Sequence, residues 1–166
     1  MIIAHLPAGY LLTKVMSSRF SPERSRSLWF WGLLASILPD ADILWFHLVD
    51  HGVRHHREYI THWPLFWLLL FILSGLFFFF KKRELLIFPI VVGANIALHL
   101  LLDCLAAPVY YAAPFSAEKL HFVQVPNLYN YWVWNFLRHW TFQLELMIWA
   151  AAILVFGLSR WEESQD

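Results

Sequence analysis

The feature that most limits how this chain can fold is an apolar run at residues 63–80, in which no side chain carries a charge. At about 1.5 Å per residue, a helix of this length covers about 27 Å, close to the roughly 30 Å hydrocarbon core of a bilayer. Residues 85–102 follow as a second run, in which Asn95 and His99 are the only polar side chains. Both runs are therefore predicted to be membrane-spanning helices.

Three further segments are candidates for spans. Residues 140–158 are apolar enough, and residues 28–49 are long enough but carry Asp40 and Asp42 in their middle. Residues 1–16 are short, and they lack the basic segment and the cleavage site of a secretory signal, so we expect a retained first helix. The fold predicted from these segments is all-α, a polytopic membrane helical bundle of about five transmembrane helices. The whole chain of 166 residues is expected to form a single membrane-embedded domain.

Composition agrees with a membrane protein and excludes several classes of function. Hydrophobic residues make up 60% of the chain and charged residues 14%, against roughly 45–50% and 25% in soluble domains. Lys and Arg number 12, as do Asp and Glu, so there is no basic field to bind nucleic acid. Cys104 is the single cysteine, which excludes an intrachain disulfide and a cysteine-rich zinc site. A bound metal would therefore be held by His and carboxylate.

The distribution of positive charge predicts the orientation in the membrane, because short loops rich in Lys and Arg stay in the cytoplasm. Two connecting segments are basic, the one after the first span and the one between the third and fourth: Lys14, Arg19, Arg24, Arg26, Lys81, Lys82 and Arg83. Both are predicted to be cytoplasmic, which puts residues 49–62 and 108–138 outside. We expect a multi-pass protein of the inner (plasma) membrane, with its candidate site toward the external or periplasmic side.

Two acids, Asp40 and Asp42, interrupt an otherwise apolar span just after Pro39. A carboxylate at membrane depth costs several kcal/mol unless it is paired, hydrated or bound to a metal. Two such carboxylates also repel each other, and a divalent cation removes that repulsion. The alternative is that Pro39 ends a short helix and the acids cap a second one at a hydrated kink.

His99 and Asp103 are spaced i, i+4 in the fourth span, so both side chains leave one face of a helix. This spacing can place an imidazole and a carboxylate on one ion, although a hydrogen-bonded pair without metal is the alternative. At about 1.5 Å per residue, Asp40, His99 and Asp103 lie roughly 18, 21 and 27 Å above the cytoplasmic ends of their spans. With His5 and His62, they are expected to gather in the outer half of the bilayer.

The remaining polar residues near this depth have less definite roles. Arg57, in the external loop, is well placed to bind a phosphate or carboxylate. Glu145 is predicted either to complete the site or to reach the membrane surface. The other histidines are expected to lie at the surface or the membrane interface: His47, His51, His121 and His139.

Taken in order, four elements resemble the YdjM-like inner-membrane metal-dependent hydrolase family. They are an N-terminal His (His5), an LPD-x-D element (residues 38–42), an HR…TH element (His56, Arg57, Thr61, His62) and an H-x-x-x-D pair (His99, Asp103). The resemblance covers about residues 5–115. The family is similar in turn, as a distant relative, to the zinc-dependent phospholipase C and P1 nuclease fold, which implies a helical core of that kind.

The resemblance implies a set of site residues. Its metal ligands would be His5, Asp40, His62, His99 and Asp103, and its catalytic residues Asp42, His56 and Arg57. Three residues separate Arg57 from Thr61 where the family has two, so either His55 or His56 takes the family position. The later H-x-x-x-E pair of the soluble phospholipases has Gln143 in place of the acid, and one or two ions are expected rather than three.

These observations favour a membrane-bound hydrolase that uses Zn²⁺ or another divalent transition metal, which mixed His and carboxylate ligation suits better than it suits Mg²⁺. The ion would lower the pKa of a bound water from 15.7 toward about 7. Whichever of Asp40 and Asp42 is not a ligand would accept the proton, Arg57 would stabilise charge on a phosphoryl or acyl oxygen, and His56 would protonate the leaving group. The expected substrate is an amphiphilic, lipid-like molecule with a phosphoester or other ester bond.

Two other classes of function are alternatives. A transporter of protons or metal ions could use the same acids and histidines as a relay. A relay should continue to the other side, and the inner half of each predicted span has no ionisable residue. A non-catalytic membrane scaffold could hold a structural metal, in which case the metal site would be coordinatively closed.

Overall fold

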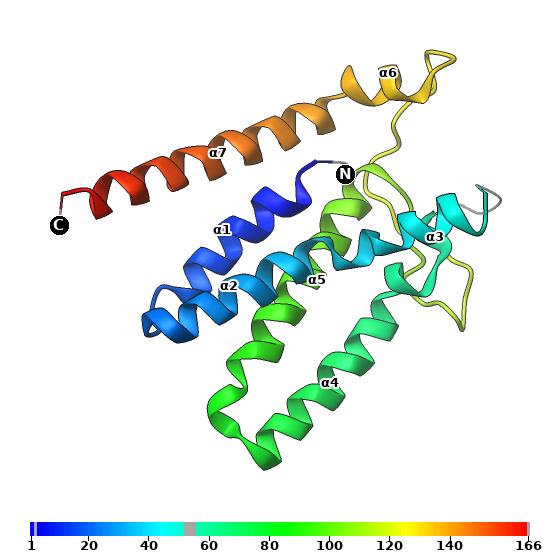
Figure 1. The fold of residues 1–166 in the computed structure, drawn as a ribbon. Coiled ribbons are helices and arrows are strands. Elements are labelled where there is room, and N and C mark those ends of the chain that lie inside the picture. Colours follow the sequence, from blue (N-terminus) through cyan, green and yellow to red (C-terminus); the bar gives the residue numbers. More distant parts are fainter. Residues whose placement is uncertain (2, 52–55, 166) are drawn as a thin grey trace.

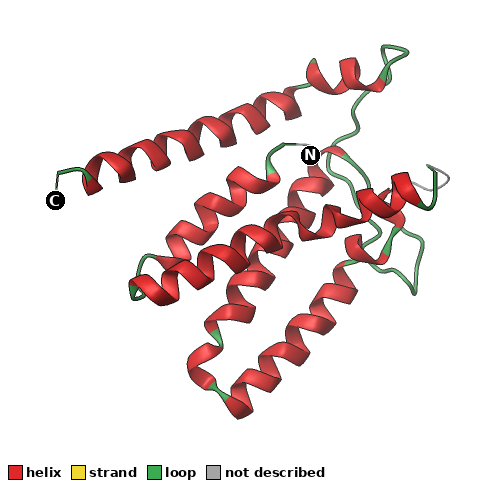
Figure 2. Cartoon of the chain, in the orientation of Figure 1, coloured by secondary structure: helices red, strands yellow, loops and turns green. Residues whose placement is uncertain are grey.

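The computed structural model describes residues 1, 3–51 and 56–165. These residues form helices joined by loops; they include no strand, and a single antiparallel bridge pairs Val109 with Leu120 (Figure 2). The α-helices are α1 (His5–Ser17), α2 (Pro22–Ile37), α3 (Asp42–Leu48), α4 (Pro64–Lys81), α5 (Ile87–Ala106), α6 (Trp132–Leu137) and α7 (Trp140–Glu163). Short 3₁₀ turns lie between them: η1 (Leu38–Ala41), η2 (His56–Glu58), η3 (Ile60–His62) and η4 (Arg83–Leu85).

Four helical segments are long and apolar enough to cross a membrane: Pro22–Leu48, Pro64–Lys81, Arg83–Ala106 and Trp140–Glu162. They correspond to four of the spans predicted from the sequence, and the predicted all-α membrane bundle is confirmed. The first predicted span is the shorter helix α1, whose 13 residues cover only about 20 Å. The count of about five spans thus becomes four long helices and one short one.

The second span is broken where its acids lie. α2 ends at Ile37, η1 carries Pro39 and Asp40, and α3 begins at Asp42. Proline has no N–H to donate and its ring crowds the preceding turn, so the α-helical hydrogen bonds cannot continue through Pro39. The break agrees with the alternative interpretation of this segment, but the predicted capping by the acids is not found, since Ala41 is the N-cap of α3. Asp40 faces His62 and His99 instead, and Asp42 faces His62.

Helix α5 lies at the centre of the bundle and packs against α1, α2 and α4, while α7 packs along α1 (Figure 1). The α1–α2 contact is close because Gly9 faces Ser36 and Gly32 faces Thr13, where an added Cβ would lie 2.3 Å from each partner. Asn95 of α5 donates to the Thr13 hydroxyl at 3.1 Å. This close packing sets the distance between the helices that carry the site.

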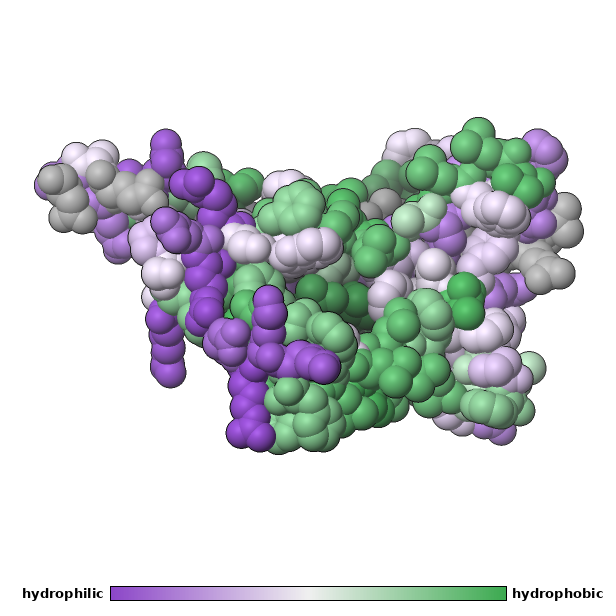
Figure 3. Space-filling view, turned by 60° about the horizontal axis from the view of Figure 1, so that its bottom comes forward, coloured by the Kyte–Doolittle hydropathy of each residue, from purple (hydrophilic) through white to green (hydrophobic). Residues whose placement is uncertain are grey.

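The two ends of the bundle differ in chemistry. The loop between α1 and α2 and the turn between α4 and α5 lie at one end, together with the basic residues of those connections. The opposite end gathers the start of α1, η1, η3 and the last turns of α5. In Figure 3, hydrophilic side chains collect mainly on the left of the face shown, beside a continuous hydrophobic surface. The candidate site lies at the end opposite the basic loops.

Candidate metal centre

Four side chains from three separate elements converge at this end of the bundle. Asp40 comes from η1, His62 from η3, and His99 and Asp103 from α5. One potential ligand atom of each lies within 4.8 Å of the other three. This is the convergence that the sequence predicted for residues up to about sixty positions apart.

The distances between the histidine nitrogens and the carboxylate oxygens are close to those around a bound metal ion. His62 Nε2 lies 3.5 Å from Asp40 Oδ1 and 3.4 Å from Asp103 Oδ2. His99 Nε2 lies 3.6 Å and 3.7 Å from the same two oxygens. With zinc–ligand bonds of about 2.0–2.1 Å, the ligand atoms of a regular tetrahedron are about 3.3–3.4 Å apart. The four separations between a histidine nitrogen and a carboxylate oxygen are therefore within a few tenths of an ångström of those in a zinc site.

Two of the atoms that face the centre, His99 Nε2 and Asp103 Oδ2, are buried and lack a hydrogen-bond partner among the described residues. His62, His99 and Asp103 are at most 1% exposed, whereas the Asp40 side chain is 24% exposed. A buried polar atom without a hydrogen-bond partner is costly, and a metal ion would remove the cost. The donor set fits a divalent transition metal.

The two histidines are held by hydrogen bonds on the side away from the centre. His62 Nδ1 lies 2.7 Å from Asp42 Oδ2, and the Thr61 hydroxyl donates to that same oxygen. His99 Nδ1 lies 2.8 Å from the backbone oxygen of Ser36. Such partners fix the proton on Nδ1 and leave Nε2 as the ligand atom. The Ser36 carbonyl was missed by sequence reasoning, because any residue type can supply a backbone oxygen.

Asp103 divides its two oxygens between two environments. Oδ2 faces the histidines, while Oδ1 accepts hydrogen bonds from Arg57 Nη2 at 3.0 Å and from the Met1 nitrogen at 2.7 Å. His5 Nε2 lies 3.4 Å from Oδ1. Arg57 therefore reaches the centre from η2, and its guanidinium contacts a candidate ligand directly.

His5 lies beside the four-residue centre and is not one of its four members. Its ring stacks on His99 with centroids 3.7 Å apart, and its Nε2 is 4.0 Å from Asp40 Oδ2. His56 begins η2, but its side chain lies outside the described part of the structure, as does the whole of His55. The predicted roles of these residues and of Asp42 and Arg57 stay predictions.

Carboxylates dominate the electrostatics of the centre. Burial of the His62 ring lowers its pKa, but the interactions with Asp103, Asp40 and Asp42 outweigh this and raise the pKa to about 10. Three carboxylates around one imidazole thus create a site that favours positive charge. The same carboxylates would stabilise a bound divalent cation.

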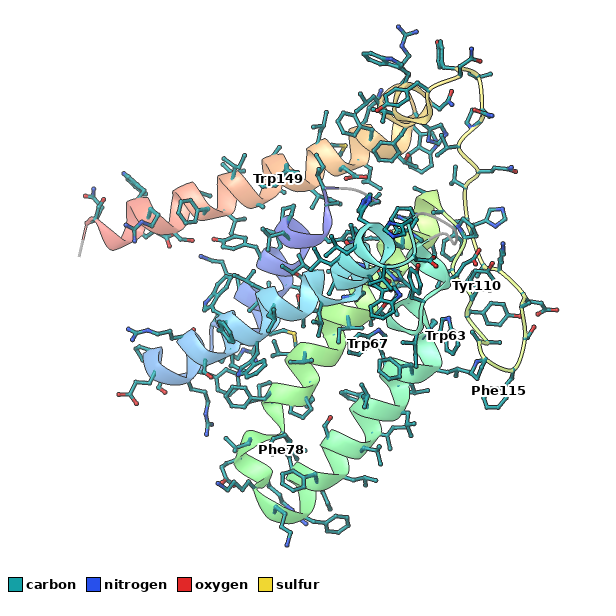
Figure 4. All side chains as sticks on the ribbon, turned by 45° about the vertical axis from the view of Figure 1, so that its right-hand side comes forward. Trp63, Trp67, Phe78, Tyr110, Phe115 and Trp149 are labelled. Atoms are coloured by element: carbon teal, nitrogen blue, oxygen red, sulfur yellow. The ribbon has the colours of Figure 1, made fainter. Side chains whose placement is uncertain are left out.

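Residues outside the centre lie where most of the sequence predictions put them. His47, His51 and His121 are exposed, and His139 caps α7 by accepting from the Thr141 N–H at 3.4 Å. Glu145 neither reaches the surface nor belongs to the four-residue centre: it is fully buried and accepts the Ile3 N–H at 2.5 Å, just ahead of α1. In Figure 4, Trp149 lies on α7 facing the start of α1, and its indole N–H donates to the Ile3 carbonyl. These contacts join α7 to the segment that precedes His5.

Comparison with known proteins identifies the family. The model of the YdjM inner membrane protein family matches residues 1–164. Nothing matched the chain in searches of curated proteins and of solved structures. The apolar spans and the family match agree on a membrane location. With this match over almost its whole length, the chain belongs to the YdjM inner membrane protein family.

Proposed function

We propose that this protein is a membrane-bound metal-dependent hydrolase that cleaves a phosphoester or other ester bond of an amphiphilic substrate. The observation that carries the proposal is the set of four potential ligand atoms at one end of a membrane bundle. In this set each histidine Nε2 lies 3.4–3.7 Å from each of the two carboxylate oxygens. A structural metal site is closed by four protein ligands, whereas a catalytic site keeps one position for water or substrate. Asp40, the most exposed of the four, is the ligand that can make way for that position.

The residues that would hold the ion are Asp40, His62, His99 and Asp103, with His5 as a neighbour. When bound, a divalent transition metal supplies Lewis-acid chemistry and an activated water at neutral pH. Zn²⁺ is the first candidate, because two imidazoles and two carboxylates suit it better than they suit Mg²⁺.

The protein's own residues would divide the remaining work. Asp42 orients His62 through the 2.7 Å contact with Nδ1, so we assign it a positioning role. Asp40, the most exposed of the four, would be the carboxylate that accepts a proton when it is not holding the ion. Arg57 stabilises negative charge that develops on the substrate oxygen, because its guanidinium lies beside Asp103 and is 11% exposed. His56 remains the candidate for protonating the leaving group.

Metal analysis of the purified protein tests the proposal first. Wild type is expected to hold close to one Zn²⁺ or equivalent ion per chain, and His99→Ala and Asp103→Ala are expected to lose most of it. His121→Ala, which removes an exposed histidine, is the matched control and should keep the metal. Equal metal contents in wild type and the two centre variants would exclude the proposed site.

Activity is then measured on phosphomonoester, phosphodiester and carboxylic ester lipids in detergent. Turnover of one of these classes is expected in wild type, and a chelator should abolish it until Zn²⁺ is restored. Metal bound at full occupancy with no turnover of any class would argue for a structural centre. Under the orientation predicted by the basic loops, the active site opens on the periplasmic side.

A further inference from the structure

A large apolar cavity lies between α4 and α5 and opens on the side of the bundle. Its volume is about 910 Å³, near the upper end of the range for ligand pockets. Small residues of α5 line one side: Ala94 and Ala97 leave the space open, and Gly93 lies against the Phe71 ring of α4. Ala97 itself is exposed, so the cavity is a groove reached from outside the bundle.

Every surface of this groove suits hydrocarbon. Its walls are aliphatic and aromatic, and the hydroxyl of Ser74, its one lining residue with a hydroxyl, donates to the Phe71 backbone oxygen at 3.0 Å. No residue of α4 is buried, and Leu68 and Leu101 are more than half exposed. In a membrane-spanning helix, such a groove faces lipid rather than water. The occupant it fits is therefore an acyl or isoprenoid chain.

The length of the groove matches one leaflet of a bilayer. Along α4 its lining runs from Pro64 to Ser74, and along α5 from Cys104 to Pro89. At about 1.5 Å per residue these stretches span about 15 Å and about 22 Å, at least half of the roughly 30 Å hydrocarbon core. A lipid tail standing in its own leaflet occupies this depth.

One end of the groove adjoins the metal centre. Cys104 follows the ligand Asp103, and Pro64 comes two residues after His62. Trp67, which lines this end, donates its indole N–H to the Thr61 backbone oxygen at 2.6 Å, and the Thr61 hydroxyl donates to Asp42. Figure 4 places Trp63 and Trp67 at the end of α4 near the polar cluster and Phe78 toward the other end. The groove thus leads directly away from the centre into the bilayer.

We infer that the groove between α4 and α5 holds one hydrocarbon tail of a membrane lipid whose headgroup lies at the metal centre. This inference rests on the proposed function for the statement that this lipid is the substrate. The lipid would consist of a long apolar chain joined to a polar ester group. It would come from the leaflet in which the centre lies. A short or water-soluble ester would leave the groove unfilled.

Photo-crosslinking in nanodiscs tests the groove without any turnover. The full-length protein is placed in a bilayer of phosphatidylethanolamine and phosphatidylglycerol that contains a phospholipid with a diazirine in the middle of one tail. Preferential labelling of groove residues of α4 and α5 over exposed residues of α7 is expected. Ala97→Phe fills the groove and should reduce that labelling to the level of α7. Ala151→Phe makes the same change at an exposed alanine of α7 and should have no effect.

A second variant and a kinetic measurement complete the test. Leu101→Trp narrows the groove from an exposed position and should reduce labelling as Ala97→Phe does. Where wild type hydrolyses a lipid, Ala97→Phe is expected to lower kcat/KM for the long-chain form at least about tenfold more than for a short-chain homologue, the equivalent of about two buried methylene groups. Metal content, measured on each variant, verifies that the centre is intact.

The outcomes separate this inference from the proposed function. If the groove is labelled, both variants remove the labelling and the protein shows no hydrolytic turnover, the tail site is supported and the hydrolase is overturned. The opposite result would overturn the tail site and leave the hydrolase in place. In that case turnover depends on metal, but lipid labelling is equal in the groove and on α7, or neither variant changes it.

Discussion

Asp103 illustrates how single residues of the centre combine two tasks. Its Oδ1 accepts a hydrogen bond from Arg57, and its Oδ2 faces His62 and His99. The first contact offsets the cost of a buried carboxylate, since the side chain is fully buried. The second leaves an oxygen for an ion. The i, i+4 spacing with His99 predicted the shared face, but only the folded chain supplies Arg57 on the other oxygen.

The role of Asp42 leads to a prediction about metal affinity. Asp42→Ala removes the partner of His62 Nδ1, so the ring loses its fixed orientation and a negative charge that strengthens its binding. We expect Zn²⁺ affinity to fall about 10- to 100-fold, measured by competition with a chromophoric chelator. Asp42→Asn keeps a hydrogen-bond acceptor, so its Zn²⁺ affinity should lie between those of wild type and Asp42→Ala. Asp50→Ala, which removes the acceptor of the Tyr59 hydroxyl, is the control and should bind as wild type. Unchanged affinity in Asp42→Ala would contradict the positioning role.

Arg57 is expected to affect turnover without weakening metal binding. Arg57→Gln removes a positive charge 3.0 Å from Asp103, which makes the centre more favourable to a cation. Metal content should therefore stay at the wild-type level. Turnover should fall about 10²- to 10³-fold, the usual loss when one group that stabilises transition-state charge is removed. Loss of the metal together with turnover would show that Arg57 supports the centre structurally instead.

The helices bring the site together through a few close contacts. Gly9 and Gly32 allow α1 and α2 to approach, and α5 joins them through Asn95 and the contact of His99 with the Ser36 carbonyl. Pro39 ends α2 before Asp40, so this carboxylate leaves the helix and reaches the histidines. The chemistry of proline made the break at Pro39 one of the two interpretations of this span. The sequence did not predict the close α1–α2 contact, because a glycine acquires that role only from the partner it faces.

Gly9 offers a test of this packing. A Cβ at Gly9 would lie 2.3 Å from Ser36 Cβ, so Gly9→Ala must push α1 away from α2. Such overpacking costs about 1–3 kcal/mol, which exceeds the gain of up to about 1 kcal/mol in helix propensity. The Tm in detergent should fall, and zinc affinity with it, since Ser36 also holds His99.

Gly75→Ala is the matched control for Gly9→Ala. Nothing lies within 4 Å of the Cβ that this substitution adds to α4, so only helix propensity changes. Its Tm should equal or exceed that of wild type. Equal Tm values for the two variants would mean that the α1–α2 contact does not limit stability.

On the scale of the molecule, the separation of the basic loops from the centre predicts the arrangement in the membrane. Positive loops stay in the cytoplasm, so the metal centre and the loop that carries Lys119 should lie on the periplasmic side. Single cysteines introduced as Arg24→Cys and Lys82→Cys should react with an impermeant maleimide only after the inner membrane is opened. Lys119→Cys should react while it is intact. A Cys104→Ala background removes the native thiol, which is buried.

Two results of this labelling would count against the structure or the orientation. Arg24→Cys and Lys82→Cys labelled from opposite sides would contradict the bundle, which puts both connections at one end. If Arg24→Cys and Lys82→Cys both react from the periplasm and Lys119→Cys is protected, the orientation is reversed and the centre lies at the cytoplasmic face.

Properties that follow from neighbouring residues could be derived from the chain alone. The lengths of the apolar runs, the basic loops, the break at Pro39 and the shared face of His99 and Asp103 each depend on a few consecutive residues. The distances of 3.4–3.7 Å between ligand atoms, the Ser36 carbonyl behind His99 and the groove beside α5 depend on how helices pack. Packing joins residues distant in the chain through shape and close contact, and these interactions exist only once the bundle has formed.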